Sequence, residues 1–154
     1  KRDSHFSEEK NAEFVEFCRS TGLRRSEITT LRGDQLIEKD GEYYIEVVGK
    51  GGRFRIITIC GDVALVVRKM QEAGTGKVWE KVPSNADIHD FRAQYASRIY
   101  SSYARPIEKI PRKERYICRK DKAGIVYDKA AMLETSKALG HNRISVVGEH
   151  YLRF

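Results

Sequence analysis

Apolar residues recur at helical spacing along most of the chain. Residues 4–21, 63–72, 88–100 and 130–139 each place apolar side chains about every third or fourth position, so each is predicted to form an amphipathic helix. Shorter helices are predicted at 21–31 and 145–152. Gly22, Gly74 and Gly140 follow three of these stretches and are expected to end them.

The period changes from helical to alternating after residue 34. Residues 35–39, 43–48 and 53–59 read as three strands, and Asp40-Gly41 is a strong signal for a hairpin turn between the first two. Gly49-Lys50-Gly51-Gly52 connects the second and third strands and is expected to place Lys50 at an exposed tip. Alternation predicts that Arg53 and Arg55 share one face, forming a basic edge.

These elements predict an α+β fold that is mainly helical and has a small three-stranded antiparallel sheet. With 154 residues, the chain has the length of one domain, 1–154, that can bury a sizeable core. Because it begins with Lys1, we expect a fragment of a longer protein.

Residues 101–128 depart from this regular pattern. They are rich in Lys and Arg, interrupted by acidic residues and interleaved with tyrosines, a mixture that suits contacts with phosphate groups. The plainer interpretation is a solvated excursion. Within it, residues 116–119 and 124–127 are predicted to pair as a second hairpin.

The charge balance favours a polyanionic partner. The chain has 29 Lys and Arg against 22 Asp and Glu, a formal net charge of +7, although many basic domains bind no nucleic acid. Its three cysteines show neither a disulfide framework nor zinc-ligand spacing. No apolar run reaches the roughly 20 residues of a membrane span, so we expect a cytoplasmic protein that does not enter the membrane.

Four short motifs follow one another in a fixed order. They are T-G-L-R-R-S-E at 21–27, V-G-K-G at 48–51, H-D-F-R at 89–92, and L-G-H at 139–141 followed by a tyrosine at 151. Each motif alone is weak, but together they resemble the catalytic domain of the tyrosine recombinases, the phage-type integrase family. The match covers nearly the whole chain. It implies a bacterial or phage-encoded enzyme that cuts and rejoins double-stranded DNA without a metal or cofactor.

The resemblance assigns roles to the motif residues. The implied catalytic residues are Arg24, Lys50, His89, Arg92, His141 and Tyr151, with Glu27 as a supporting partner. Contacts with DNA are expected from Arg25, Arg53, Arg55, Arg112, Lys113 and Arg115. Relatives of this kind carry a core-binding domain before the catalytic one and act as tetramers on DNA, so we expect the full-length protein to do the same.

The chemistry explains why such residues are needed. Attack by a phenolate on a phosphodiester builds negative charge on phosphate oxygens, which Arg24 and Arg92 would bind through forked hydrogen bonds. A tyrosine has an ordinary pKa of about 10, so a base is required, and His89 is the candidate. Lys50 would protonate the leaving 5′-oxygen, and His141 would donate a hydrogen bond to the phosphate.

Two features depart from the family pattern. His141 and Tyr151 are ten residues apart, one more than is usual, and on a continuous helix the extra residue would rotate Tyr151 by roughly 100°. His150 is a competing histidine. The distance from Arg92 to Leu139 is also long, so residues 101–128 are expected to be an insertion that lies against DNA.

Three other interpretations stay open. A type IB topoisomerase uses similar Arg, Lys, His and Tyr chemistry and would relax supercoiled DNA. A non-catalytic DNA-binding module would need the basic residues but not Tyr151. A tyrosine near the end of a helix is also commonly a packed ring with a solvated hydroxyl.

Overall fold

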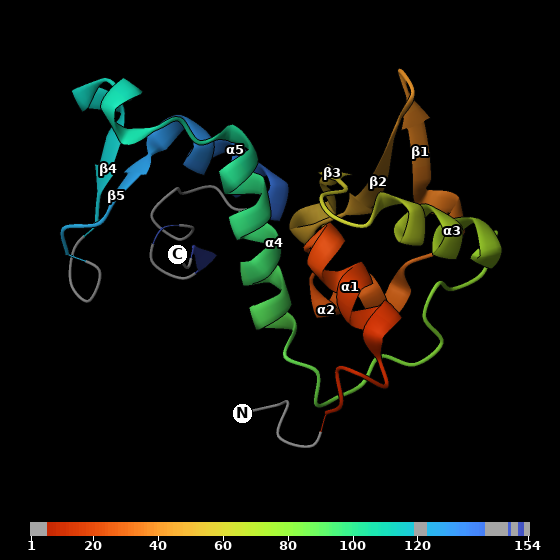
Figure 1. Cartoon of the computed structure of the whole chain (residues 1–154). Helices are drawn as coiled ribbons and strands as arrows, with labels where there is room; N and C mark the ends of the chain where they lie inside the picture. Colours follow the sequence, from red (N-terminus) through yellow and green to blue (C-terminus); the bar gives the residue numbers. More distant parts are fainter. Residues whose placement is uncertain (1–5, 119–122, 141–147, 149–150, 153–154) are drawn as a thin grey trace.

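Helix α4 (Ile88–Tyr103) is the central element of the fold (Figure 1). In the computed structural model, which describes residues 6–118, 123–140, 148 and 151–152, α4 packs against α1 on one side and α5 on the other. The remaining α-helices are α1 (Ala12–Thr21), α2 (Arg25–Thr30), α3 (Val63–Ala73) and α5 (Lys129–Leu139). Four single-turn 3-10 helices connect them: η1 (Gly33–Gln35), η2 (Lys50–Gly52), η3 (Ile107–Lys109) and η4 (Arg112–Glu114).

Two small antiparallel sheets accompany the helices. Strands β1 (Leu36–Lys39), β2 (Glu42–Val48) and β3 (Phe54–Thr58) form a meander in that order, and β4 (Arg115–Ile117) pairs with β5 (Val126–Asp128). The turn between β1 and β2 uses positive φ angles at Asp40 and Gly41, as the hairpin signal indicated. The predicted α+β class, with its three-stranded sheet and its second hairpin, is confirmed.

The first of two hydrophobic clusters lies between α1, the β1–β2–β3 sheet and α3. Phe17, Leu23, Ile28, Ile45 and Ile57 are fully buried in it. This cluster fixes the end of α1 and the start of α2, the segment that carries the first of the four motifs.

The second cluster lies between α4, α5 and the β4–β5 hairpin. Tyr95 and Ile99 of α4 meet Leu139 of α5 there, and the cluster also includes Tyr151 and Leu152. Tyr151 is 7% exposed and Leu152 is fully buried. Tyr151 and Leu152 are therefore packed into the core next to α4.

A partly buried ion pair within residues 101–128 and a hydrogen bond to Tyr100 fix this segment to α4. Arg105 donates from Nε to Oδ2 of Asp128 at 2.8 Å and from Nη2 to Oδ1 at 2.7 Å, and Asp128 is fully buried. The backbone N–H of Asp128 donates to the Tyr100 hydroxyl of α4 at 2.8 Å. The hydrogen bonds from Arg105 outweigh burial and lower the pKa of Asp128 to about 2.

We expect Asp128→Asn to lower the free energy of unfolding by about 2 kcal/mol at pH 7, less than for a fully buried pair because Arg105 is partly exposed. Since the pKa of Asp128 is depressed by folding, its contribution is present above pH 4 and is lost as the pH falls towards 2. Urea unfolding at several pH values should therefore show a smaller loss between pH 4 and pH 2 in the variant. An equal loss in both proteins would contradict this role.

One helix boundary and one strand face differ from the sequence predictions. Helix α1 begins at Ala12, not near the start of the predicted 4–21 stretch, because Ser7 begins a separate turn over residues 8–11, in which its hydroxyl accepts from the backbone N–H of Lys10. On β3 the outward side chains are apolar, with Phe54 71% and Ile56 49% exposed. None of the described helices is long and apolar enough to cross a membrane.

Candidate active site

The first motif is held in place by the end of α1. Gly22 ends the helix with a left-handed φ of 65°, and a Cβ there would overlap the ring of Tyr95 from α4. Glycine satisfies both the backbone angle and the close approach. The chain then turns so that Arg24 precedes α2 and its backbone N–H donates to Oε1 of Glu27 at 2.8 Å.

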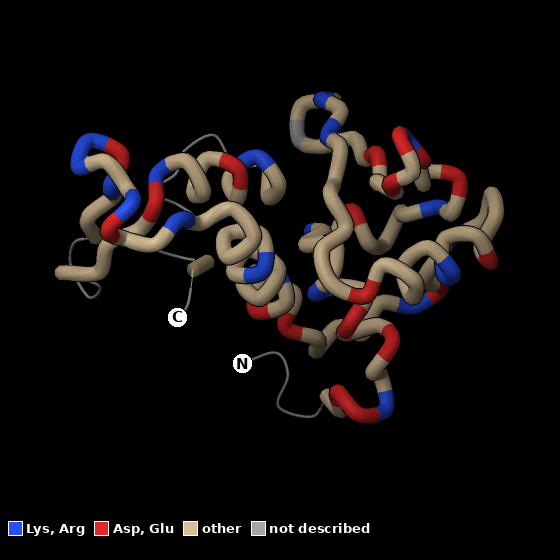
Figure 2. Tube along the Cα trace, turned by 45° about the horizontal axis from the view of Figure 1, so that its top comes forward, with Lys and Arg blue, Asp and Glu red and all other residues tan. Residues whose placement is uncertain are grey.

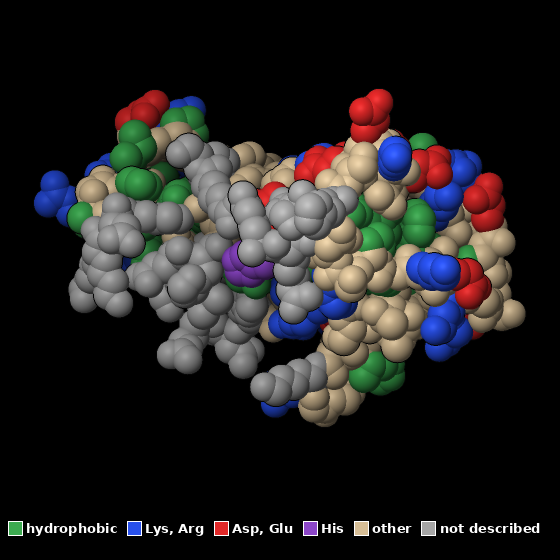
Figure 3. Space-filling model, turned by 90° about the horizontal axis from the view of Figure 1, so that it is seen from below, with side chains coloured by type: hydrophobic (Ala, Val, Ile, Leu, Met, Phe, Trp, Pro, Cys, Tyr) green, Lys and Arg blue, Asp and Glu red, His purple; other side chains and the backbone are tan. Residues whose placement is uncertain are grey.

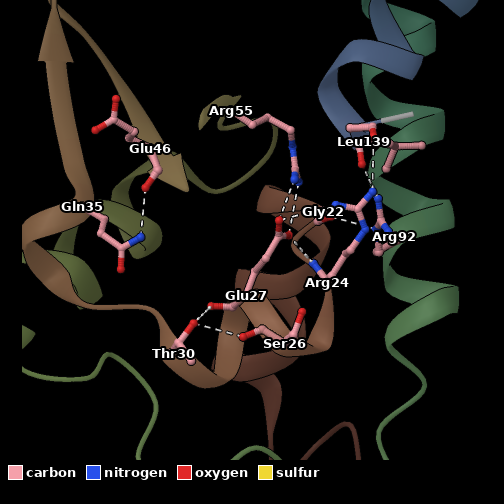
Figure 4. A network of polar contacts seen from close by, with 11 residues as sticks. Gly22, Arg24, Ser26, Glu27, Thr30, Gln35, Glu46, Arg55, Arg92 and Leu139 are labelled. Carbon is pink, nitrogen blue, oxygen red and sulfur yellow. Dashed lines mark hydrogen bonds and ion pairs between the residues drawn. The ribbon is translucent and has the colours of Figure 1, made fainter. Parts of the chain in front are cut away.

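Glu27 is the anchor for two arginines (Figure 4). Arg55 of β3 donates from Nη1 to Oε2 at 2.6 Å and from Nη2 to Oε1 at 3.2 Å, while Nη1 of Arg24 lies 3.5 Å from Oε2. Burial would raise the pKa of Glu27, but the hydrogen bonds from Arg55 and from the Arg24 backbone, with the charges of both arginines, lower it below its ordinary value. Glu27 is therefore a buried carboxylate at neutral pH.

The predicted basic edge of Arg53 and Arg55 is wrong for Arg55. Its side chain is only 11% exposed and points inward with Ile57, because a buried carboxylate binds a guanidinium more strongly than solvent does. Arg53 is exposed just before β3. Each face of β3 carries an apolar residue: Ile56 follows Phe54 on one face, and Ile57 follows Arg55 on the other. Alternation alone therefore did not identify the inner face.

Arg92 is buried at the centre of the site. Its Nε donates to the carbonyl of Gly22 at 3.0 Å and its Nη2 to the carbonyl of Leu139 at 2.7 Å, so it joins the first motif to the last (Figure 4). Burial, together with the charges of Arg24 and Arg55, lowers the pKa of Arg92 to about 10 against the opposing effect of Tyr151. At neutral pH the guanidinium remains positively charged.

Tyr151 lies against His89 and Arg92 of the H-D-F-R motif. The centroids of the His89 and Tyr151 rings are 4.8 Å apart, and Cζ of Arg92 lies 5.3 Å from the centroid of the Tyr151 ring. The three-residue spacing of His89 and Arg92 on α4 puts both on one face, as predicted. His89 is exposed, and Figure 3 shows histidine at the surface beside Lys and Arg side chains.

Arg24 binds the chain next to Arg92, at the end of α5. Its Nη2 donates to the carbonyl of Gly140 at 3.3 Å, one residue beyond the carbonyl that Arg92 binds. The structure thus brings together Arg24, Arg92, His89 and Tyr151 from three distant segments. Of the other residues in the predicted catalytic set, Lys50 begins η2 between β2 and β3, as expected for the hairpin tip, and His141 is outside the described residues.

The arginines expected to contact DNA divide into two groups. Arg25 donates to the carbonyls of Pro83 and Ala86 at 2.9 and 2.6 Å, and Arg115 donates to those of Ile110 and Ile107 at 2.9 and 3.1 Å, so both tie loops to neighbouring segments. The exposed residues are Arg53, Arg112 and Lys113. Lys and Arg are interspersed with Asp and Glu along the segment that holds β4 and β5 (Figure 2).

No family model, curated protein or solved structure matches the chain. Within the described ranges, no cluster of three or more His, Cys, Asp or Glu side chains is arranged to hold a metal ion.

Proposed function

We propose that this domain is the catalytic part of a tyrosine-type site-specific recombinase that cuts and rejoins double-stranded DNA. The observation that carries the proposal is the convergence of His89 and Arg92 on the ring of Tyr151, with Arg24 anchored next to Arg92 at the end of α5. These residues come from three of the four motifs that the sequence analysis identified.

The charges around Glu27 favour an anionic substrate. Three guanidiniums, those of Arg24, Arg55 and Arg92, share the surroundings of one carboxylate. Two positive charges are not balanced by that carboxylate, and burying a guanidinium near others is costly. A phosphodiester would offset the charge, with the remaining N–H groups of Arg24 and Arg92 bound to its oxygens.

In the proposed reaction, the phenolic oxygen of Tyr151 attacks the phosphorus atom of a DNA strand. The phenol proton passes to His89, a bond forms between the tyrosine oxygen and phosphorus, and the bond to the 5′-oxygen breaks. The leaving oxygen takes a proton from Lys50 and becomes a 5′-hydroxyl. The 3′-phosphotyrosine keeps the energy of the bond, so a 5′-hydroxyl of a partner strand reverses the step without a nucleotide cofactor.

A covalent capture experiment tests this function. The protein is incubated with a pool of end-labelled duplexes that carry a randomised centre and a nick, so that a short fragment diffuses away after cleavage and prevents rejoining. We expect a labelled adduct that survives boiling in detergent, and mass spectrometry should locate it on Tyr151. Tyr151→Phe should give no adduct, because the nucleophilic oxygen is absent.

Tyr103→Phe is the matched control, since this tyrosine is exposed at the end of α4 and has no assigned role. It should form the adduct at the parental rate. If duplexes that the protein binds give no adduct, or if Tyr151→Phe gives as much as the parent, the proposal is wrong. Relaxation of supercoiled plasmids that does not depend on a particular sequence would favour a topoisomerase instead.

A further inference from the structure

Gly148, three residues before Tyr151, lies in a narrow space between two side chains. A Cβ at this position would be 2.7 Å from Cε of Met132 in α5 and 3.2 Å from a ring carbon of Tyr116 in β4. Both distances are shorter than ordinary van der Waals contact, so a larger residue at position 148 would displace the side chains of Met132 and Tyr116. Tyr116 of the hairpin and Met132 of α5 therefore lie close to the backbone of Gly148.

The β4–β5 hairpin has an inner and an outer face. Tyr116 is directly opposite Tyr127 in the antiparallel register, and both belong to the inner side with Cys118, which is buried. The ring of Tyr127 meets that of Tyr100 on α4 edge to face, with centroids 5.4 Å apart. Ile117, between Tyr116 and Cys118, is 63% exposed on the outer face. The hairpin thus packs one aromatic face against the cluster that contains Tyr151.

The same hairpin is fixed to the helix that carries His89 and Arg92. Asp128, the last residue of β5, binds Arg105 and the hydroxyl of Tyr100, and its Oδ1 accepts from the backbone N–H of Ala130 at the start of α5. Tyr100 follows Arg92 by two helical turns on α4. A rigid connection therefore links α4, the hairpin and the start of α5.

We propose that the excursion between α4 and α5 is an intramolecular brace that positions the Tyr151 ring against His89 and Arg92, with Tyr116 as the positioning residue that contacts the backbone at Gly148. This proposal rests on the proposed function, because the position of the Tyr151 ring affects catalysis only if Tyr151 is the nucleophile. The 101–128 segment then has a role within the chain, in addition to any contact that Arg112 and Lys113 make with DNA.

The first readout reports the position of the ring without any reaction. 3-Fluorotyrosine is placed at position 151 only, and its ¹⁹F resonance is recorded in the full chain. Tyr116→Ala removes the ring that touches Gly148, so we expect the resonance to move towards that of free 3-fluorotyrosine and to broaden. Tyr116→Phe keeps the ring and Ile117→Ala changes only the outer face, so both should retain the parental resonance.

The second readout is the rate of adduct formation with the nicked duplex pool, measured with natural tyrosine at 151. Tyr116→Ala should slow the adduct about 100-fold with little change in affinity for the duplexes, because a small misplacement of a reacting group costs rate more than binding. Tyr116→Phe and Ile117→Ala should react at the parental rate.

Thermal unfolding is measured for every variant. If Tyr116→Ala does not fold, Gly148→Val replaces it, because the valine side chain pushes Tyr116 and residue 148 apart without removing core atoms.

The two readouts separate the brace from the proposed function. An unchanged ¹⁹F resonance in folded Tyr116→Ala or Gly148→Val overturns the brace, whatever the reaction rate. If the resonance moves as expected but not even the parent forms an adduct, the brace stands as a packing device and the recombinase function is wrong. A shifted resonance together with a slower adduct supports both.

Discussion

Replacing Arg92 by lysine is expected to slow the attachment of Tyr151 to DNA by about 100- to 1,000-fold, the range seen when one preorganised donor to a developing anion is lost. Arg92 binds the carbonyls of Gly22 and Leu139 and is thereby held beside the Tyr151 ring. Lysine keeps the charge but lacks the planar fork, so it would neither hold both carbonyls nor bind two phosphate oxygens. Single-turnover adduct formation with the nicked duplexes measures the effect.

Arg98→Lys is the matched control on the same helix. Arg98 also joins distant segments, binding Glu16 of α1 and the carbonyl of Cys60, but it faces α1 rather than Tyr151. We expect both variants to lose stability to a similar extent, whereas only Arg92→Lys should react slowly at a temperature where both are folded. Equal rates for the two variants would mean that Arg92 has a structural role alone.

The elements of this fold were predictable because their signals are local. Helices α3, α4 and α5 follow the 3.6-residue period of their apolar side chains, and the β-meander follows alternation between glycine-containing turns. The start of α1 was not predicted correctly. Ser7 is a good helix cap by residue type, but its hydroxyl accepts from Lys10 in a preceding turn, and α1 begins only after Asn11.

The candidate site was predictable only in part. His89 and Arg92 share a helix face, so their spacing was enough to place them together. The role of Arg55 was not evident, because both faces of β3 carry apolar residues and the ion pair with Glu27 joins residues 28 positions apart. The contact of Tyr116 with Gly148 has no local pattern either, since the two lie on separate elements.

Replacing Glu27 by glutamine is expected to destabilise the domain by about 3 to 5 kcal/mol, because Arg55 would keep a buried charge without its carboxylate. Replacing both residues, as Glu27→Gln with Arg55→Met, removes that charge as well. The double variant should therefore recover stability to within about 1 kcal/mol of the parent. Chemical denaturation of the parent, both single variants and the double variant gives the coupling between the two sites.

Reactivity should not recover with stability in that double variant. Glu27 also binds the backbone N–H of Arg24 and lies near its guanidinium. Glutamine can still accept from that N–H, but the guanidinium of Arg24 loses its carboxylate whether or not Arg55 is present. We expect adduct formation to remain roughly 10- to 100-fold slow, since small misplacements of a catalytic group have effects of this size. The exposed pair of Glu13 and Arg68 is the control: Glu13→Gln with Arg68→Met should leave both the free energy of unfolding and the rate almost unchanged, because solvent screens an exposed ion pair. A stable double variant that reacts at the parental rate would show that Glu27 serves the fold through Arg55 and does not position Arg24 for the reaction.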